Sequence, residues 1–163
     1  MNPKVEQRPV DRYYEEYNQV YQRGISPVLV YLSVVFILFG MLGVAWAIPF
    51  PHIAFLGQYN MYLNWASFLV AGLIYYFLRL SPILSYIMLL VLFVLSYGII
   101  QLEQWQKAGG PSLLAIGLVV LVTGMVLQLL MYRMAKTYFN AFLYIKAMVW
   151  TMVNLLKSVK LKY

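Results

Sequence analysis

Four long apolar stretches dominate the pattern of hydrophobic and polar positions along this chain. They run from about Pro27 to Ile48, Tyr62 to Leu78, Pro82 to Gln101 and Ser112 to Met131. A helix that crosses the hydrocarbon core of a bilayer needs roughly 20 apolar residues, because it rises about 1.5 Å per residue and pairs each backbone amide internally. The pattern therefore predicts four transmembrane helices.

Short breaks separate these stretches. Pro49 and Pro51 end the first stretch, and Ser81 makes a tight turn before the third. A polar loop from Glu103 to Pro111 is expected before the fourth, because its charged and amide residues lead into two glycines and a proline.

The N-terminal segment has a different periodicity. From Pro9 to Arg23 it mixes charged residues with tyrosines, and Tyr14, Tyr17 and Tyr21 share one stripe of a helix at i, i+3 and i+7. This spacing predicts a short amphipathic helix on the inner membrane surface. The stripe is expected to anchor and pack that helix, and contact with a ligand is the alternative.

The C-terminal segment, from Thr137 to Tyr163, is apolar enough to suggest a fifth crossing. Lys146 lies in its middle and would cost about 3 kcal/mol at the centre of a bilayer. We therefore expect a helix that lies in the interface or packs on the bundle. Its basic end is expected to reach anionic lipid headgroups through Lys157, Lys160 and Lys162.

The expected fold is all-α, a polytopic membrane protein with an amphipathic helix before its four crossings and an interfacial helix after them. The corresponding segments are 1–26, 27–136 and 137–163. Composition agrees, because 63% of the residues are hydrophobic and 10% are charged, against about 25% charged in soluble domains. Such a surface suits lipid better than water.

Charge predicts the orientation. Twelve Lys and Arg against five Asp and Glu give a net charge of +7, but no nucleic-acid-binding motif accompanies it, so nucleic acid is not expected as a partner. Lys and Arg collect on the cytoplasmic side of membrane proteins. Four crossings leave Lys107 alone on one side and put on the other Lys4, Arg8, Arg12, Arg23, Arg79, Arg133, Lys136, Lys146, Lys157, Lys160 and Lys162. Both chain ends are therefore expected in the cytoplasm, with the protein in a bacterial inner membrane.

Residues with the chemistry of an active site are scarce. His52 is the only histidine, there is no cysteine, and no phosphate loop, zinc helix or serine elbow is present. No metal, cofactor or catalytic residue is predicted. The polar residues at membrane depth are expected to join helices; they are Asn64, Ser67, Ser85, Ser96, Thr123 and Gln128. The glycines in the apolar stretches are expected to mark close helix packing; they are Gly40, Gly43, Gly72, Gly117 and Gly124.

Several short segments match those of a known family. They are Glu16-Tyr17, Phe39-Gly40-x-x-Gly43-x-x-Trp46-x-Ile48-Pro49, Leu63-Asn64-Trp65-Ala66, Tyr75-Tyr76-Phe77-Leu78-Arg79-Leu80-Ser81-Pro82 and Gly124-x-x-x-Gln128. In these segments, between about Tyr13 and Tyr132, the chain resembles the small membrane proteins typified by the 2-hydroxy fatty acid dioxygenase of alpha-oxidation. The resemblance implies a four-helix shell and iron(II) held by histidines near the cytoplasmic face.

The chain departs from this family at the metal. Tyr21, Val30 and Tyr132 stand where the resemblance places histidines. Val30 has no donor atom, and two tyrosines make a poor ferrous site. The shell is therefore expected without the metal chemistry.

Two functions follow from these observations. The first is a non-catalytic structural or accessory subunit of a larger bacterial membrane complex, in contact with lipids and with other integral membrane subunits. The alternative is an enzyme of 2-hydroxy fatty acid or other lipid metabolism, using an altered site near Tyr21, Gln128 and Tyr132. A channel or transporter has less support, because no charged residue lies in the middle of a predicted crossing and no pair of interrupted helices is present.

Overall fold

A computed structural model describes residues 8–51, 57, 63–136, 142–158 and 160. These residues form six α-helices and no strand. The helices are α1 (Pro9–Tyr21), α2 (Pro27–Ala47), α3 (Trp65–Leu80), α4 (Pro82–Lys107), α5 (Leu113–Met134) and α6 (Phe142–Ser158).

Local sequence explains where these helices begin. The helices α1, α2 and α4 each have a proline in the first turn, where the missing N–H would have no partner inside the helix. The Asn64 side chain caps α3 by accepting from the Ser67 N–H at 2.9 Å. Ser112 caps α5 by accepting from the Ala115 N–H at 3.2 Å.

Three helices are long and apolar enough to cross a membrane: α2, α4 and α5, with 21, 26 and 22 residues. The second predicted crossing, from about Tyr62 to Leu78, corresponds to α3, which is apolar but has only 16 residues. At about 1.5 Å per residue it is shorter than the roughly 30 Å of a hydrocarbon core. By length and composition, the described residues therefore contain three helices that could span a membrane and one shorter apolar helix.

The helix α4 continues beyond its predicted end. Glu103 to Lys107, expected in a loop, form its last turns. The helix ends just before Gly109, whose φ of 97° lies in the left-handed region that glycine adopts without strain. The prediction was wrong here because polar side chains end an apolar stretch without ending a helix.

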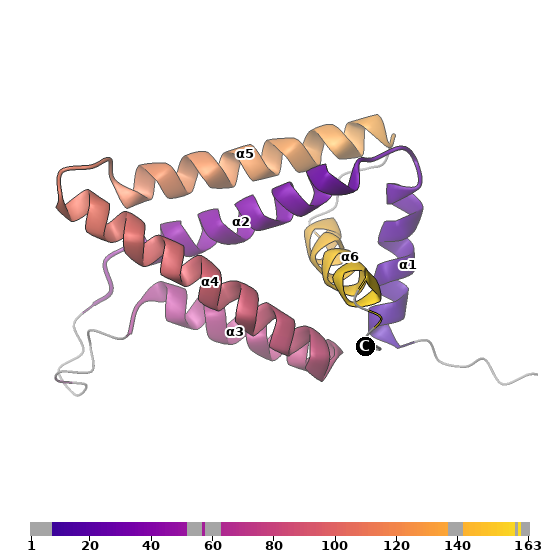
Figure 1. The fold of residues 1–163 in the computed structure, drawn as a ribbon, viewed down its shortest axis with the longest axis horizontal. Helices are drawn as coiled ribbons and strands as arrows, with labels where there is room; N and C mark the ends of the chain where they lie inside the picture. The colour runs from indigo at the N-terminus through magenta and orange to yellow at the C-terminus, as the bar shows by residue number, and fades with distance from the viewer. Residues whose placement is uncertain (1–7, 52–56, 58–62, 137–141, 159, 161–163) are drawn as a thin grey trace, which may run out of the picture.

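The membrane-length helices and α3 lie as two pairs in Figure 1, α2 beside α5 and α3 beside α4, while α1 and α6 lie at one end of α2 and α5. We call this the basic end. It holds every described Lys and Arg except one: Arg8, Arg12, Arg23, Arg79, Arg133, Lys136, Lys146, Lys157 and Lys160. The opposite end, which we call the tryptophan end, holds Trp46, Trp65 and Trp105, together with Lys107.

Glycines bring α2 and α5 together. A Cβ atom on Gly40 would lie 2.6 Å from the Leu121 backbone, and one on Gly124 would lie 2.9 Å from the Ile37 backbone nitrogen. Gly43 and Gly117 face each other, with the added Cβ of Gly43 only 3.4 Å from the Gly117 Cα. These four glycines lie at close contacts, as predicted. Gly72 does not, because a Cβ there would meet nothing within 4 Å.

The C-terminal helix α6 packs on the bundle, one of the two placements predicted for it. Its residues Ala147 to Val153 are all buried, and it contacts α1, α2 and α4. A helix lying on a membrane surface would bury one face only, so α6 is part of the core at the basic end. The tyrosine stripe of α1 faces this helix.

Candidate functional site

The first candidate site lies at the basic end, around Trp150 of α6. The indole of Trp150 is 2% exposed. Its ring centroid lies 5.7 Å from that of Tyr17, 4.5 Å from that of Tyr21 and 6.0 Å from that of Tyr31. We call these four residues the aromatic joint, because they connect α6 to α1 and α2.

Polar bonds hold α6 to α1 on both sides of the aromatic joint. The Trp150 Nε1 donates to the Asn18 side chain at 3.3 Å, and the Tyr14 hydroxyl donates to Asn154 Oδ1 at 3.2 Å. Hydrogen bonds to polar side chains allow the aromatic rings to be buried without an unpaired indole N–H.

Two lysines of α6 also contact α1. Lys146 pairs with Glu16 at 2.5 Å, and the Lys146 side chain is only 17% exposed. Lys157 lies 3.7 Å from the centroid of the Tyr14 ring, in a cation–π contact. The pair with Glu16 gives the lysine in the middle of α6 a partner of opposite charge although its side chain is mostly buried.

A buried polar cluster lies beside the joint. Gln128 and Tyr132 are one turn apart on α5, and both are buried, as is Tyr17. The Tyr17 hydroxyl lies near the Tyr132 hydroxyl, short of standard hydrogen-bond geometry. Burial raises the pKa of Tyr17 to about 12. Among the described residues, neither amide atom of Gln128 has a hydrogen-bond partner, which is uncommon for a fully buried side chain.

The three positions where the resemblance places histidines do not form one donor cluster. Tyr21 packs on Trp150, Val30 is fully buried hydrocarbon, and Tyr132 is near Tyr17. Within the described ranges, no three His, Cys, Asp or Glu side chains are grouped to hold a metal ion. His52 and Lys162 lie outside the described residues, whereas Lys160 is exposed at the basic end.

The other polar residues predicted at membrane depth mostly bond within their own helix or its cap. Ser85 donates to the Ile74 carbonyl at 3.2 Å and so joins α4 to α3, as predicted. Thr123 instead donates to Val119 of its own helix, at 2.7 Å. Asn64 and Ser67 form the cap of α3.

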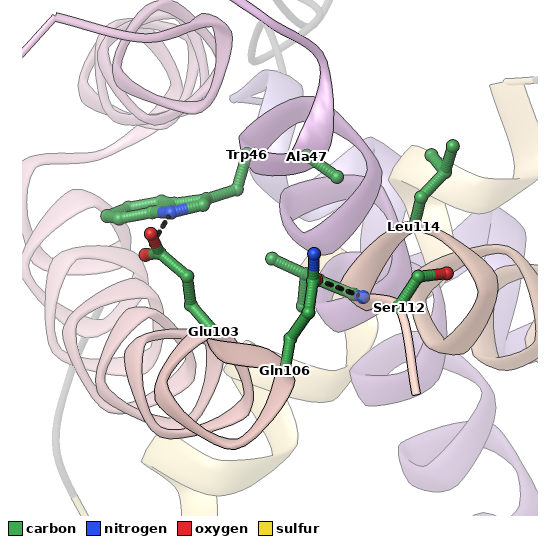
Figure 2. A pocket seen from close by; sticks show the side chains of 7 residues that line it. Trp46, Ala47, Glu103, Gln106, Ser112 and Leu114 are labelled. Atoms are coloured by element: carbon green, nitrogen blue, oxygen red, sulfur yellow. Dashed lines mark hydrogen bonds between the residues drawn. The ribbon is translucent and has the colours of Figure 1, made fainter. Parts of the chain in front are cut away.

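The second candidate site is a pocket of about 230 Å³ at the tryptophan end, between the end of α2, the end of α4 and the start of α5. Figure 2 shows Trp46 and Glu103 on one side, Ser112 and Leu114 on the other, and Gln106 between them. The Trp46 Nε1 donates to Glu103 Oε2 at 2.9 Å. Gln106 Oε1 accepts from the Leu113 N–H at 2.6 Å.

Sequence reasoning missed the central residues of both sites. Trp150 could have been recognised as a candidate core residue, because it is a large aromatic residue in the middle of an apolar tail. Its partners in α1 could not be predicted, because they are more than 120 residues away in the sequence. Glu103 and Gln106 were expected in a loop, where i, i+3 and i+4 relations between side chains would not apply.

Comparison with known proteins identified no relative of this chain. No family model, curated protein sequence or solved structure matches this chain.

Proposed function

We propose that this chain is an integral membrane protein with four crossings, whose basic end faces the cytoplasm of a bacterium from the inner membrane. The support is the alternation of the helices: α3 runs back beside α4, so each of α2 to α5 connects the two ends in Figure 1. Membranes thin or helices shift by small amounts to accommodate a short crossing such as α3. Basic residues at one end favour the cytoplasmic side for that end.

Single-cysteine labelling tests this topology, because the chain has no native cysteine. Cysteine placed at Gln22, Pro82 or Ser158, which are all exposed, is expected to react only from the cytoplasmic side. Cysteine at Pro51 or Ala108 is expected to react only from the opposite side. Equal labelling of cysteines at positions 82 and 108 from one side would contradict four crossings.

Within this placement, we propose a non-catalytic, accessory role in a larger membrane complex. The observation that carries the proposal is the aromatic joint. The region to which the resemblance assigns metal chemistry is filled by Trp150 and hydrocarbon, with Val30 fully buried. Side chains that fix one helix against another suit a structural part better than a substrate site.

Two helices offer surface for partner subunits. Along α4 and α5, large apolar side chains are exposed, including Phe93 at 73% and Val119 at 66%. In a bilayer such faces contact lipid or another helix, and packing against a helix is driven by shape rather than by exclusion of water. The accessory role therefore predicts partner helices on α4 or α5.

Photo-crosslinking in native membranes tests the accessory role. A photoreactive residue at Phe93 or Val119 is expected to capture the same protein partner, and that partner is expected to copurify with the tagged chain in mild detergent. A photoreactive residue at Leu92, which is 2% exposed, is the matched control and is expected to capture none. A chain that purifies alone and crosslinks only to lipid from Phe93 and Val119 contradicts the proposal.

An enzyme of lipid metabolism is the second candidate, favoured by one observation. Gln128 is fully buried with both amide atoms unpartnered among the described residues, one turn from Tyr132. Such an amide is suited to bind a polar group of a bound molecule. Stoichiometric iron in the purified protein, or loss of lipid turnover on Tyr132→Phe, would support this candidate; metal-free protein with unchanged turnover would exclude it.

A further inference from the structure

The pocket at the tryptophan end lies where lipid headgroups would surround the protein. Trp46 lines it, and Trp65 and Trp105 lie at the same end of the helices. Tryptophan prefers the headgroup level of a bilayer. The volume of about 230 Å³ lies below the roughly 300–1,000 Å³ of typical ligand pockets, which suits a small polar group rather than a whole lipid.

The pocket combines a carboxylate with an adjacent ammonium group. Glu103 is in its wall, and Lys107 Nζ lies 2.7 Å from Glu103 Oε1. The Lys107 side chain is 72% exposed and the Glu103 side chain 33%. Lys107 does not itself line the pocket, but this ion pair places its exposed ammonium group beside the Glu103 carboxylate, which does. A ligand with one positive and one negative group would complement them.

Gln106 supplies a neutral donor in the same place. Its Oε1 is occupied by the Leu113 N–H, which fixes the orientation of the amide. Its Nε2 has no partner among the described residues, and Figure 2 shows the Gln106 side chain in the middle of the pocket. An amide N–H held in this way can donate to a phosphate oxygen.

We propose that this pocket binds the headgroup of a zwitterionic phospholipid with a primary ammonium group, such as phosphatidylethanolamine. The ammonium group lies at Glu103, beside the Trp46 ring, and the phosphate lies between Lys107 and the Gln106 amide. This inference rests on the membrane placement proposed above and is independent of the accessory role.

The chemistry distinguishes this headgroup from other common ones. A glycerol headgroup has a phosphate but no cation for Glu103. A choline headgroup has a cation but no N–H to donate to the carboxylate. An ethanolamine headgroup provides both, and charge-assisted hydrogen bonds are the stronger class.

Two nearly isosteric variants test the assignment. Glu103→Gln keeps an acceptor for the Trp46 indole and removes the negative charge. Gln106→Glu keeps an acceptor for the Leu113 N–H and replaces the N–H₂ donor with an oxygen that repels phosphate. Gln104→Glu is the matched control, because Gln104 is exposed on the same helix and does not line the pocket.

The measurement is native mass spectrometry of the full chain, purified in detergent and supplied with phosphatidylethanolamine or phosphatidylglycerol. The unmodified chain is expected to retain phosphatidylethanolamine preferentially. Glu103→Gln is expected to weaken that binding roughly tenfold without weakening phosphatidylglycerol binding. Gln106→Glu is expected to weaken binding of both lipids, and Gln104→Glu is expected to match the unmodified chain.

Equal retention of the two lipids by the unmodified chain, or equal effects of Glu103→Gln and Gln104→Glu, would overturn the proposal. Free phosphoethanolamine is the second arm: displacement of bound lipid by it supports a headgroup site, whereas binding of the free compound with no lipid bound overturns the assignment to a membrane lipid. Extraction of membranes with alkaline carbonate tests the membrane placement separately from the headgroup pocket. Release of the chain there refutes the membrane placement itself, while a retained chain with no headgroup preference refutes only the pocket.

Discussion

The pair α2–α5 and the pair α1–α6 are held together by different physics. In α2–α5, glycines allow backbone to approach backbone, as at Gly40 and Leu121. In α1–α6, an indole is packed among phenol rings, and hydrogen bonds and an ion pair lie around it. Lipid solvates an apolar side chain as well as another helix does, so close fit stabilises helix pairs in a bilayer. At the basic end, outside the apolar spans, removing aromatic surface from water is itself favourable.

The largest effect is expected from emptying the aromatic joint. Trp150→Ala removes a buried indole and its bond to Asn18, which is expected to destabilise the protein by about 3–5 kcal/mol and to release α6 from α1. Thermal unfolding in detergent and proteolysis of the tail measure both effects. Trp105→Ala is the control, since Trp105 is 54% exposed. Equal melting of the two variants would show that the joint does not hold α6.

A smaller effect is expected where α2 meets α5. Gly40→Ala forces the two backbones apart or strains them, because the added Cβ lies 2.6 Å from Leu121 atoms, and is expected to cost about 1–3 kcal/mol. Gly72→Ala is the matched control in an apolar helix with open space. It is expected to be neutral or to stabilise by up to about 1 kcal/mol. If the two substitutions shift the thermal midpoint alike, backbone contact is not what joins α2 to α5.

The Glu16–Lys146 ion pair sharpens the comparison further. Because Glu16 is 43% exposed at its side chain, solvent screens the pair, and Lys146→Met is expected to cost about 0.5–1 kcal/mol. The loss should shrink as salt is raised. A double-mutant cycle with Glu16→Gln measures the coupling energy between the two side chains. A coupling energy of zero at low salt would show that the ion pair does not stabilise the packing of α6.

The smallest effect at neutral pH is expected from Tyr17→Phe. The Tyr17 hydroxyl is buried, and burial raises its pKa from 10.0 to about 12. When the pKa of a group is higher in the folded than in the unfolded state, the group contributes its full share to stability below the unfolded-state pKa. That share is lost as the pH rises from the unfolded-state pKa through the folded-state pKa. The unmodified chain should therefore lose stability between about pH 10 and pH 12, and the Tyr17→Phe variant should lack this share of the loss. Identical alkaline unfolding curves for both proteins would contradict the burial of this hydroxyl.

Much of the fold could be predicted because it depends on local patterns. Apolar length defines α2 and α5 to within a few residues, and the i, i+3, i+7 tyrosines define α1. The close-packing glycines were recognisable because a missing side chain in an apolar helix has few other uses. The end of α4 was not predictable from polarity, since helix and loop both accept Glu, Gln and Lys.

The two candidate sites were predicted only in part. The resemblance pointed to Tyr21, Val30 and Tyr132 at the basic end, yet the residue that fills this place is Trp150, from a segment outside the resemblance. The pocket at the tryptophan end forms where the ends of α2 and α4 pack near the start of α5, and the sequence alone does not show that these segments are neighbours.

By itself, the sequence determined that this is an all-helical chain with membrane-length apolar helices and that its positive charge gathers at one end. Those properties depend on hydrogen bonding along a helix and on the transfer of side chains out of water. Both contributions are fixed within each segment, without contact with other segments. Only the tertiary structure decided that α6 is buried rather than spread on a surface, and that Glu103 and Gln106 share a pocket. Both depend on which distant segments meet, and the free energy of such contacts belongs to pairs of segments rather than to either one.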